Sequence, residues 1–196
     1  WEAMMQVNEN GNSFSLLGWI QKRINAVLGF IPLPNSACAF RPWIDPYMYL
    51  RNTLDQLSRG WRSCKKISTV WWLYKVDIKD FFNSITEDQV RIVWERSLPI
   101  LTKSTYNKEI IDILTLLSCY NGRLNQWPPS SPAIANIVWY LTIDNELRWI
   151  EKTRNIWSDR NPKSLWMRYL RYADDIMVLS FDWPIPSDIP GNIHDT

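Results

Sequence analysis

Cysteine is scarce in this sequence of 196 residues, and its spacing excludes two classes of protein. The three cysteines, Cys38, Cys64 and Cys119, lie far apart and form no C-x-x-C pair. They support neither a disulfide framework nor a zinc site, so a reducing compartment is the default. The cytoplasm is therefore the expected location, with an organellar matrix as the alternative.

Long apolar runs and a strong net charge are also missing. No stretch reaches the ~20 consecutive apolar residues that cross a bilayer, and no basic start followed by an apolar run marks a signal peptide. We therefore expect no membrane partner. With 22 Lys and Arg against 20 Asp and Glu, the net charge is only +2. Nucleic-acid contacts must then come from local patches rather than from an overall basic chain.

Glycine is the third shortage, and it is matched by an excess of tryptophan. The chain holds 6 Gly and 13 Trp, whereas average usage of about 7% would give roughly 14 Gly. Apolar residues make up 46% of the chain, so it is not a disordered tail. A chain of this length buries roughly 70% of its unfolded surface, which is enough for a sizeable core.

The patterns that are present mix helices and strands. Three- and four-residue spacing of apolar residues, with Asp45-Pro46, Thr86 and Ser131-Pro132 as helix starts, predicts a set of helices. They are expected over 13–28, 45–60, 86–99 (with Pro99 as the boundary), 106–118 and from 131 onward. The 106–118 helix is expected to turn Ile110, Ile113, Leu114 and Leu117 inward, and Asn121-Gly122 to turn the chain.

Two regions read as strands. Residues 70–78 are β-branched and aromatic, which predicts a mostly buried strand with Asp77 near its end. Residues 165–180 predict a strand, a tight turn holding Asp174 and Asp175, and a second strand. The mixture indicates an α+β fold with helices packed on a small antiparallel sheet.

The three acids in these strands carry the chemistry. A carboxylate in an apolar strand is costly unless it is paired, protonated or bound to a metal. If the strands are neighbours, Asp77, Asp174 and Asp175 form a cluster suited to Mg²⁺, which prefers oxygen ligands. Two ions about 4 Å apart would serve phosphoryl transfer. The alternative is that each acid caps a strand or pairs with Lys75, Lys79 or Arg171.

Four segments, in order, resemble the motifs of reverse transcriptases. Residues 76–85, 126–136 and 171–175 are similar to that family's A, B and C motifs, and Phe40-Arg41-Pro42 is similar to its fingers motif. Residues 142–147 also resemble the Leu-Asp-x-Glu-Leu that follows motif B in many members. The resemblance covers roughly residues 39–180 and is nearest to group II intron maturases, retrons and defence enzymes.

The resemblance implies a role for each matching residue. Asp77, Asp174 and Asp175 would be the catalytic metal ligands for two Mg²⁺ ions, with Mn²⁺ as a substitute. Phe82 would be the steric gate that selects deoxynucleotides. The remaining nucleotide-binding candidates are Arg41, Phe81, Gln126, Ser131 and Pro132. The template and primer candidates are Asn136, Tyr172, Arg59, Arg62, Lys65 and Lys66. A looser second basic group comprises Arg148, Lys152, Arg154, Arg160, Lys163, Arg168 and Arg171.

Two residues depart from the family pattern. Trp43 and Trp127 stand where the family has glycine, which permits unusual backbone angles and close approach to a ligand. A tryptophan there would project into space that the nucleotide or template needs. The family also continues into a thumb, whereas this chain stops about twenty residues after Asp175, so we expect a fragment of a longer protein.

The fold implied is a right-hand polymerase palm, a ferredoxin-like antiparallel sheet with helices, plus partial fingers and no thumb. Residues 1–69 would be fingers and 70–196 palm, with about 99–125 as a stretch that could return to the fingers. The implied function is RNA-directed DNA polymerisation, with an RNA template, a DNA or RNA primer and dNTPs. The alternatives are an inactive RNA-binding, splicing or defence module, and an RNA-dependent RNA polymerase.

Overall fold

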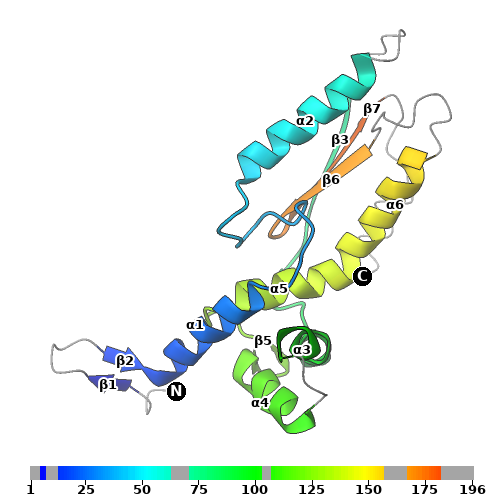
Figure 1. Ribbon diagram of the computed structural model, residues 1–196. Coiled ribbons are helices and arrows are strands. Elements are labelled where there is room, and N and C mark those ends of the chain that lie inside the picture. The colour runs from blue at the N-terminus through cyan, green and yellow to red at the C-terminus, as the bar shows by residue number, and fades with distance from the viewer. Residues whose placement is uncertain (1–4, 8–12, 63–70, 103–106, 157–166, 182–196) are drawn as a thin grey trace. The chain divides into compact units, whose positions relative to one another are not determined.

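The computed structural model describes residues 5–7, 13–62, 71–102, 107–156 and 167–181 (Figure 1). The chain forms two compact units, each built from two separate stretches. The first unit combines Trp1–Pro32 with Asp80–Val138, and the second combines Leu33–Lys79 with Trp139–Thr196. The division into fingers and palm remains a prediction. Within the described residues, no helix has both the length and the apolar stretch that crossing a bilayer requires.

The first unit is mainly helical. Its elements are β1 (Met5–Val7), β2 (Ser13–Ser15), α1 (Leu16–Leu28), α3 (Glu87–Thr102), α4 (Lys108–Ser118), β4 (Cys119–Tyr120), β5 (Arg123–Leu124) and α5 (Ser131–Trp139), whose last residue belongs to the second unit. Helices α3 and α4 pack together. Val90, Val93 and Ile111 are fully buried between elements of this unit, so an apolar core holds it.

Local chemistry explains where two of these elements begin or turn. Thr86 and Gln89 form a capping box, since each side chain accepts a hydrogen bond from the other's backbone N–H, at 2.9 and 3.3 Å. Asn121 and Gly122 have φ of 50° and 72°. Positive φ at both central residues suits the two-residue hairpin that joins β4 to β5. The predicted turn at Asn121-Gly122 is confirmed.

The second unit holds a three-stranded antiparallel sheet in the order β3-β7-β6. Its strands are β3 (Trp71–Asp77), β6 (Met167–Tyr172) and β7 (Asp175–Phe181). The helices α2 (Pro46–Arg62) and α6 (Asn145–Ile156) both contact β6. A π-helical segment, η2 (Tyr140–Asp144), joins α5 to α6. The predicted mixture of helices and antiparallel sheet is confirmed.

Several expected details are wrong. Helix α3 continues through Pro99, which lies exposed inside it and does not end it. Helix α4 buries Ile111, whereas Ile110 and Ile113 are exposed, so its inward face is rotated from the predicted one. Strand β3 is the edge of its sheet, and Trp72 and Leu73 are exposed rather than buried.

Candidate active site

The three predicted acids gather at one end of two adjacent strands. Asp77, the last residue of β3, pairs in register with Asp175, the first residue of β7. Residues directly opposite in an antiparallel pair place their side chains on the same face of the sheet. The backbone N–H of Ile78 donates to the Asp174 carbonyl at 2.8 Å, which fixes the acidic turn beside the end of β3.

A lysine that the motif comparison does not single out completes this end of the sheet. Lys75 lies two residues before Asp77 on the exposed side of the edge strand, and its Nζ is 2.8 Å from Oδ1 of Asp175. The Asp175 carboxylate, followed by the charges of Asp77 and Asp174, raises the pKa of Lys75. The alternative that at least one acid pairs with Lys75 therefore holds for Asp175.

The donor chemistry of these acids suits Mg²⁺, because carboxylate oxygens are its preferred protein ligands. Their side chains, however, are not drawn together around one point. Among the residues that the structure describes, no group of three or more His, Cys, Asp or Glu side chains is arranged to hold a metal ion. Asp175 instead contacts Lys75 through Oδ1.

The turn between β6 and β7 contains a residue with an unfavourable backbone conformation. Tyr172 pairs with Asp175, which leaves Ala173 and Asp174 as a two-residue loop. Ala173 has φ of 53°, in the left-handed region that costs a residue with a Cβ roughly 1–2 kcal/mol. Contacts from outside the turn must therefore hold it in this conformation.

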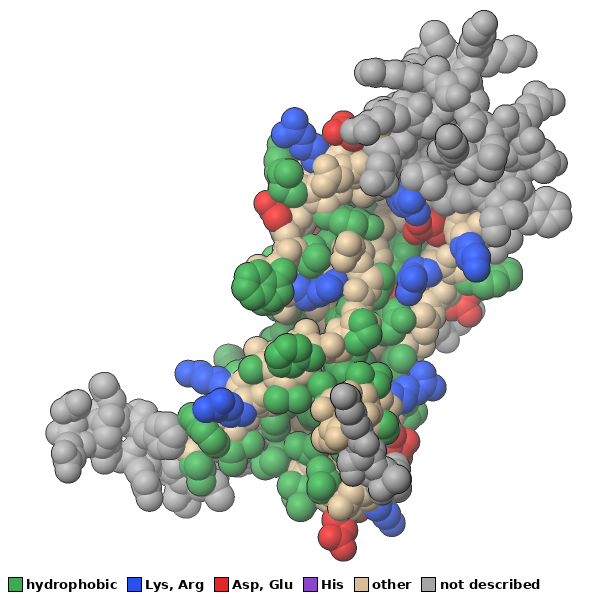
Figure 2. Space-filling model, viewed as in Figure 1, with side chains coloured by type: hydrophobic (Ala, Val, Ile, Leu, Met, Phe, Trp, Pro, Cys, Tyr) green, Lys and Arg blue, Asp and Glu red, His purple; other side chains and the backbone are tan. Residues whose placement is uncertain are grey.

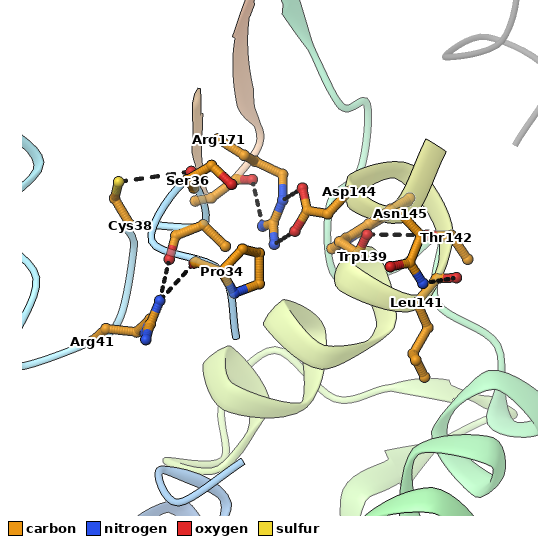
Figure 3. A network of polar contacts seen from close by, with 12 residues as sticks. Pro34, Ser36, Cys38, Arg41, Trp139, Leu141, Thr142, Asp144, Asn145 and Arg171 are labelled. Carbon is orange, nitrogen blue, oxygen red and sulfur yellow. Dashed lines mark hydrogen bonds and ion pairs between the residues drawn. The ribbon is translucent and has the colours of Figure 1, made fainter. Parts of the chain in front are cut away.

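A fully buried ion pair supplies those contacts (Figure 3). The Arg171 guanidinium donates to both carboxylate oxygens of Asp144, at 3.0 and 2.8 Å, and neither side chain is exposed to solvent. Its Nη1 also donates to the Ala173 carbonyl at 3.3 Å. Burial raises the pKa of Asp144, and the charge of Arg171 opposes that rise. Such bidentate geometry is strong and directional.

The same arginine anchors the 34–41 loop through its backbone. The Arg171 N–H donates to the Ser36 carbonyl at 2.7 Å, and the Arg171 carbonyl accepts from the Cys38 N–H at 2.9 Å. Arg41 braces the loop internally, since its Nη1 donates to the carbonyls of Pro34 and Ala37 at 2.7 and 3.2 Å. One nitrogen of the proposed triphosphate-binding residue is thus already engaged.

The motif B candidates lie together in the first unit. Gln126 is exposed, while Ser131 and Asn136 are buried in α5. The Ser131 hydroxyl donates to the Asn125 carbonyl, which ties the start of the helix to the preceding loop. Gln126 also lines a cavity of about 600 Å³ in this unit, together with Asn83, Arg123 and Trp127.

The two tryptophans at family glycine positions both face solvent. Trp43 is 92% exposed and Trp127 is 87% exposed. Among the described residues, the non-glycine residues with positive φ are Phe40, Asp80, Asn121 and Ala173. Neither tryptophan is among them, so the backbone at these two positions does not itself require glycine.

The two phenylalanines after motif A differ in burial. Phe81 is buried and Phe82 is half-buried, with their rings edge to face at a centroid separation of 5.0 Å. Phe81 therefore packs in the core, and Phe82 keeps part of its surface exposed.

Of the remaining candidates, Tyr172 is exposed beside the turn. Arg59 and Arg62 lie in α2, and Lys65 and Lys66 lie outside the described residues. In the second basic group, Arg171 is wholly buried, so it is not a surface contact for phosphate. Arg154, Arg160 and Lys163 have no described side chains.

Sequence reasoning missed the pairing of Asp144 with Arg171. Asp144 follows the apolar stripe of the helix that begins at Ser131, at a position where helical spacing directs a side chain inward. An acid at such a position predicts a buried cationic partner, because an unpaired buried charge is strongly unfavourable. The sequence thus indicates a buried cationic partner for Asp144, but it does not identify which arginine that partner is.

Known proteins resemble this chain in sequence and in fold. No protein-family profile matches the chain. Retron Ec86 reverse transcriptase of Escherichia coli is 27% identical over 152 residues, covering 71% of this chain and 40% of that protein. The chain thus spans less than half the length of this curated relative. A telomerase from Candida albicans, solved in complex with a TWJ fragment of telomeric RNA, has the same fold over 91% of this chain and 32% of its own, with a TM-score of 0.55 and 10% identity.

The ordered motifs, the sequence match and the shared fold agree with one another. The predicted resemblance to reverse transcriptases is confirmed: the chain is similar in sequence to a retron reverse transcriptase and shares the fold of a telomerase.

Proposed function

We propose that this chain is the polymerising part of an RNA-directed DNA polymerase. The observation that carries the proposal is the register that sets Asp77 opposite Asp175, with Asp174 in the adjoining turn. Paired carboxylates on neighbouring strands suit the binding of divalent ions beside a phosphate. The similarity to a retron reverse transcriptase supports this reading.

In this proposal Asp77 and Asp174 are the principal ligands and Asp175 the third. Bound there, Mg²⁺ would activate a primer 3′-hydroxyl and neutralise charge on the triphosphate. Lys75 contacts Oδ1 of Asp175 and would balance part of the negative charge of the acids. Arg171, through Asp144 and the Ala173 carbonyl, keeps the turn in place.

The remaining candidate residues would select the nucleotide. Phe82 would exclude a ribose 2′-hydroxyl, and Arg41 would contact the triphosphate through the guanidinium nitrogens that face away from the loop. Gln126, Ser131, Pro132 and Asn136 would position the template and the incoming nucleotide. The expected reaction partners are an RNA template, a primer and dNTPs.

A primer-extension assay on an RNA template with Mg²⁺ tests this proposal. We expect dNTPs to be incorporated and NTPs to be excluded, and Phe82→Ala to admit NTPs while Phe81→Leu, a change at the buried neighbour, does not. Incorporation of NTPs in preference to dNTPs by the unaltered chain would instead indicate an RNA-dependent RNA polymerase.

A second candidate is an inactive RNA-binding module. The near-complete exposure of Trp43 and Trp127, at positions where the family has glycine, favours it. Restoring glycine at both positions separates the two candidates. If Trp43→Gly with Trp127→Gly gains incorporation that the unaltered chain lacks, the tryptophans block a functional catalytic centre; RNA binding without incorporation in either form supports the inactive module.

A further inference from the structure

A second cavity, of about 650 Å³, lies wholly within the second unit. The 34–36 loop, Tyr49 of α2, Arg168 of β6 and one face of α6 line it. Cavities of this size accept ligands as large as a nucleotide. Ser36, whose carbonyl accepts a hydrogen bond from the Arg171 N–H, is part of this lining.

The lining has an excess of positive charge. It includes three cations, Arg148, Lys152 and Arg168, and a single carboxylate, Glu151. Arg168 forms an ion pair with Glu151, so Arg148 and Lys152 remain in excess over the acids of the lining. The nearby Asp144 is already held by Arg171 in a bidentate pair. Figure 2 shows the blue side chains gathered over α6.

The face of α6 toward this cavity is exposed and mostly polar. Asn145, Arg148, Trp149 and Lys152 recur at three- and four-residue spacing, so they share one side of the helix. All four are exposed, and Trp149 is 66% exposed. An exposed indole between two cations combines a stacking surface for a base with donors for phosphate, the features that bind single strands.

The cavity lies away from the acids along the same strand. Arg168 precedes Tyr172 by four residues of β6, which corresponds to about 13 Å along an extended strand. Arg168 pairs with Leu179, whereas Tyr172 pairs with Asp175 at the turn. Asp77, Asp174 and Asp175 do not line this cavity, so a ligand bound there would be separate from the three acids.

We infer that this cavity binds the phosphodiester backbone of single-stranded RNA, with a base stacked on Trp149, and so tethers RNA apart from the catalytic acids. Charge complementarity and the exposed indole argue for a nucleic-acid strand rather than an apolar partner. Recognition by phosphate and stacking implies little sequence preference. The inference does not depend on the proposed polymerase activity.

The test is fluorescence anisotropy with a short fluorescein-labelled poly(U) RNA, measured in EDTA and without nucleotides. The double variant Arg148→Gln with Lys152→Gln removes two cations from the cavity. Loss of two phosphate contacts should lower the salt slope by about 1.4, so that the RNA affinity of the unaltered chain falls about sevenfold more between 50 and 200 mM salt than that of the variant. The matched control, Lys22→Gln with Lys108→Gln, removes two exposed lysines outside the cavity and should keep the original slope.

Two further variants separate charge from packing. Arg148→Lys with Lys152→Arg conserves both charges and should retain binding. Trp149→Ala should weaken binding about tenfold with an unchanged salt slope, because stacking does not release counterions. All three residues are exposed, so these changes should leave the fold intact.

Three results would overturn the inference: equal salt slopes for the cavity and control variants, no RNA binding by the unaltered chain, or competition by a nucleoside monophosphate at concentrations where RNA binds. The last would assign the cavity to a small phosphorylated ligand. The binding assay contains neither metal ions nor dNTPs. Its result is therefore independent of whether the chain extends a primer.

Discussion

At the scale of single residues, the buried pair of Arg171 and Asp144 connects stability to the candidate site. Both side chains are fully buried, and the guanidinium also contacts the Ala173 carbonyl. The turn that carries Asp174 has a left-handed alanine. The position of the acids therefore depends on an interaction that none of the acids makes directly.

Breaking this pair should destabilise the chain severely. Arg171→Gln or Asp144→Asn leaves one buried charge without its partner, which costs roughly 3–5 kcal/mol of unfolding free energy. Urea unfolding measures this. The control is Arg91→Gln, which breaks the partly exposed ion pair with Asp112 and should cost far less, because exposed ion pairs contribute little to stability.

The double variant Arg171→Met with Asp144→Leu should recover most of the loss, because an apolar pair of similar volume removes both charges together. If either single variant costs less than the Arg91 control, the pair does not stabilise the second unit as described.

Burial should also protect two thiols. Desolvation raises the pKa of Cys38 to about 11 and that of Cys119 to about 12. At pH 8 the thiolate fraction of Cys38 is then roughly 100-fold lower than that of a free cysteine. In a Cys64→Ser background, a thiol reagent should label the folded chain far more slowly than the urea-unfolded chain.

The sign of the pH effect follows from these shifts. The folded state holds the thiol protons more tightly than the unfolded state, so the unfolding free energy should fall as pH rises from about 9 toward 11. Rapid labelling of the folded chain at pH 8, or stability that rises over that interval, would contradict the assigned burial.

At the scale of elements, local sequence signals predicted the three strands of the β3-β7-β6 sheet and most helix positions, but not the short strands β1, β2, β4 and β5. Asn121-Gly122, Ser131-Pro132 and the β-branched run before Asp77 each act through nearby backbone geometry, and each is found where expected. Burial was less predictable. Strands β3 and β6 both lie at an edge of the sheet, but α2 and α6 contact β6, whereas Trp72 and Leu73 of β3 are exposed, and such coverage is set by contacts distant in sequence.

Helix boundaries show the same distinction. Pro99 predicts a helix end, yet α3 continues past it to Thr102. The lost backbone donor lies on an exposed turn, where water can satisfy the freed carbonyl. The bounds of helix α6 were not predicted. Its buried Leu147 and Ile150 follow helical spacing, but the many exposed polar residues of this helix make the apolar pattern hard to recognise in the sequence.

The capping box at the start of α3 offers an element-scale test. Thr86→Ala removes the side-chain acceptor for the Gln89 N–H and should cost about 1 kcal/mol of unfolding free energy. Thr86→Ser keeps the hydroxyl and should cost only a few tenths of that. Equal losses in urea unfolding would mean that the methyl group, rather than the cap, stabilises this end.

At the scale of the whole molecule, the sequence alone predicted which acids come together. The ordered motifs predicted that Asp77 and the Asp174–Asp175 turn meet, and the register of β3 and β7 confirms that they do. The sequence offered Lys75, Lys79 and Arg171 as possible partners of the acids, and the structure pairs Lys75 with Asp175. The roles of the other candidate site residues remain predictions.

The central claim is that these carboxylates drive DNA synthesis on RNA. The most direct measurement is single-nucleotide extension of a primer on an RNA template, comparing the unaltered chain with Asp77→Asn, Asp174→Asn and the control Asp88→Asn, an exposed acid on α3. We expect extension by the unaltered chain and the control, and at least a thousandfold loss in the two site variants (about 4 kcal/mol of transition-state stabilisation) with unchanged circular dichroism. Extension by either site variant at the rate of the control would contradict the assignment.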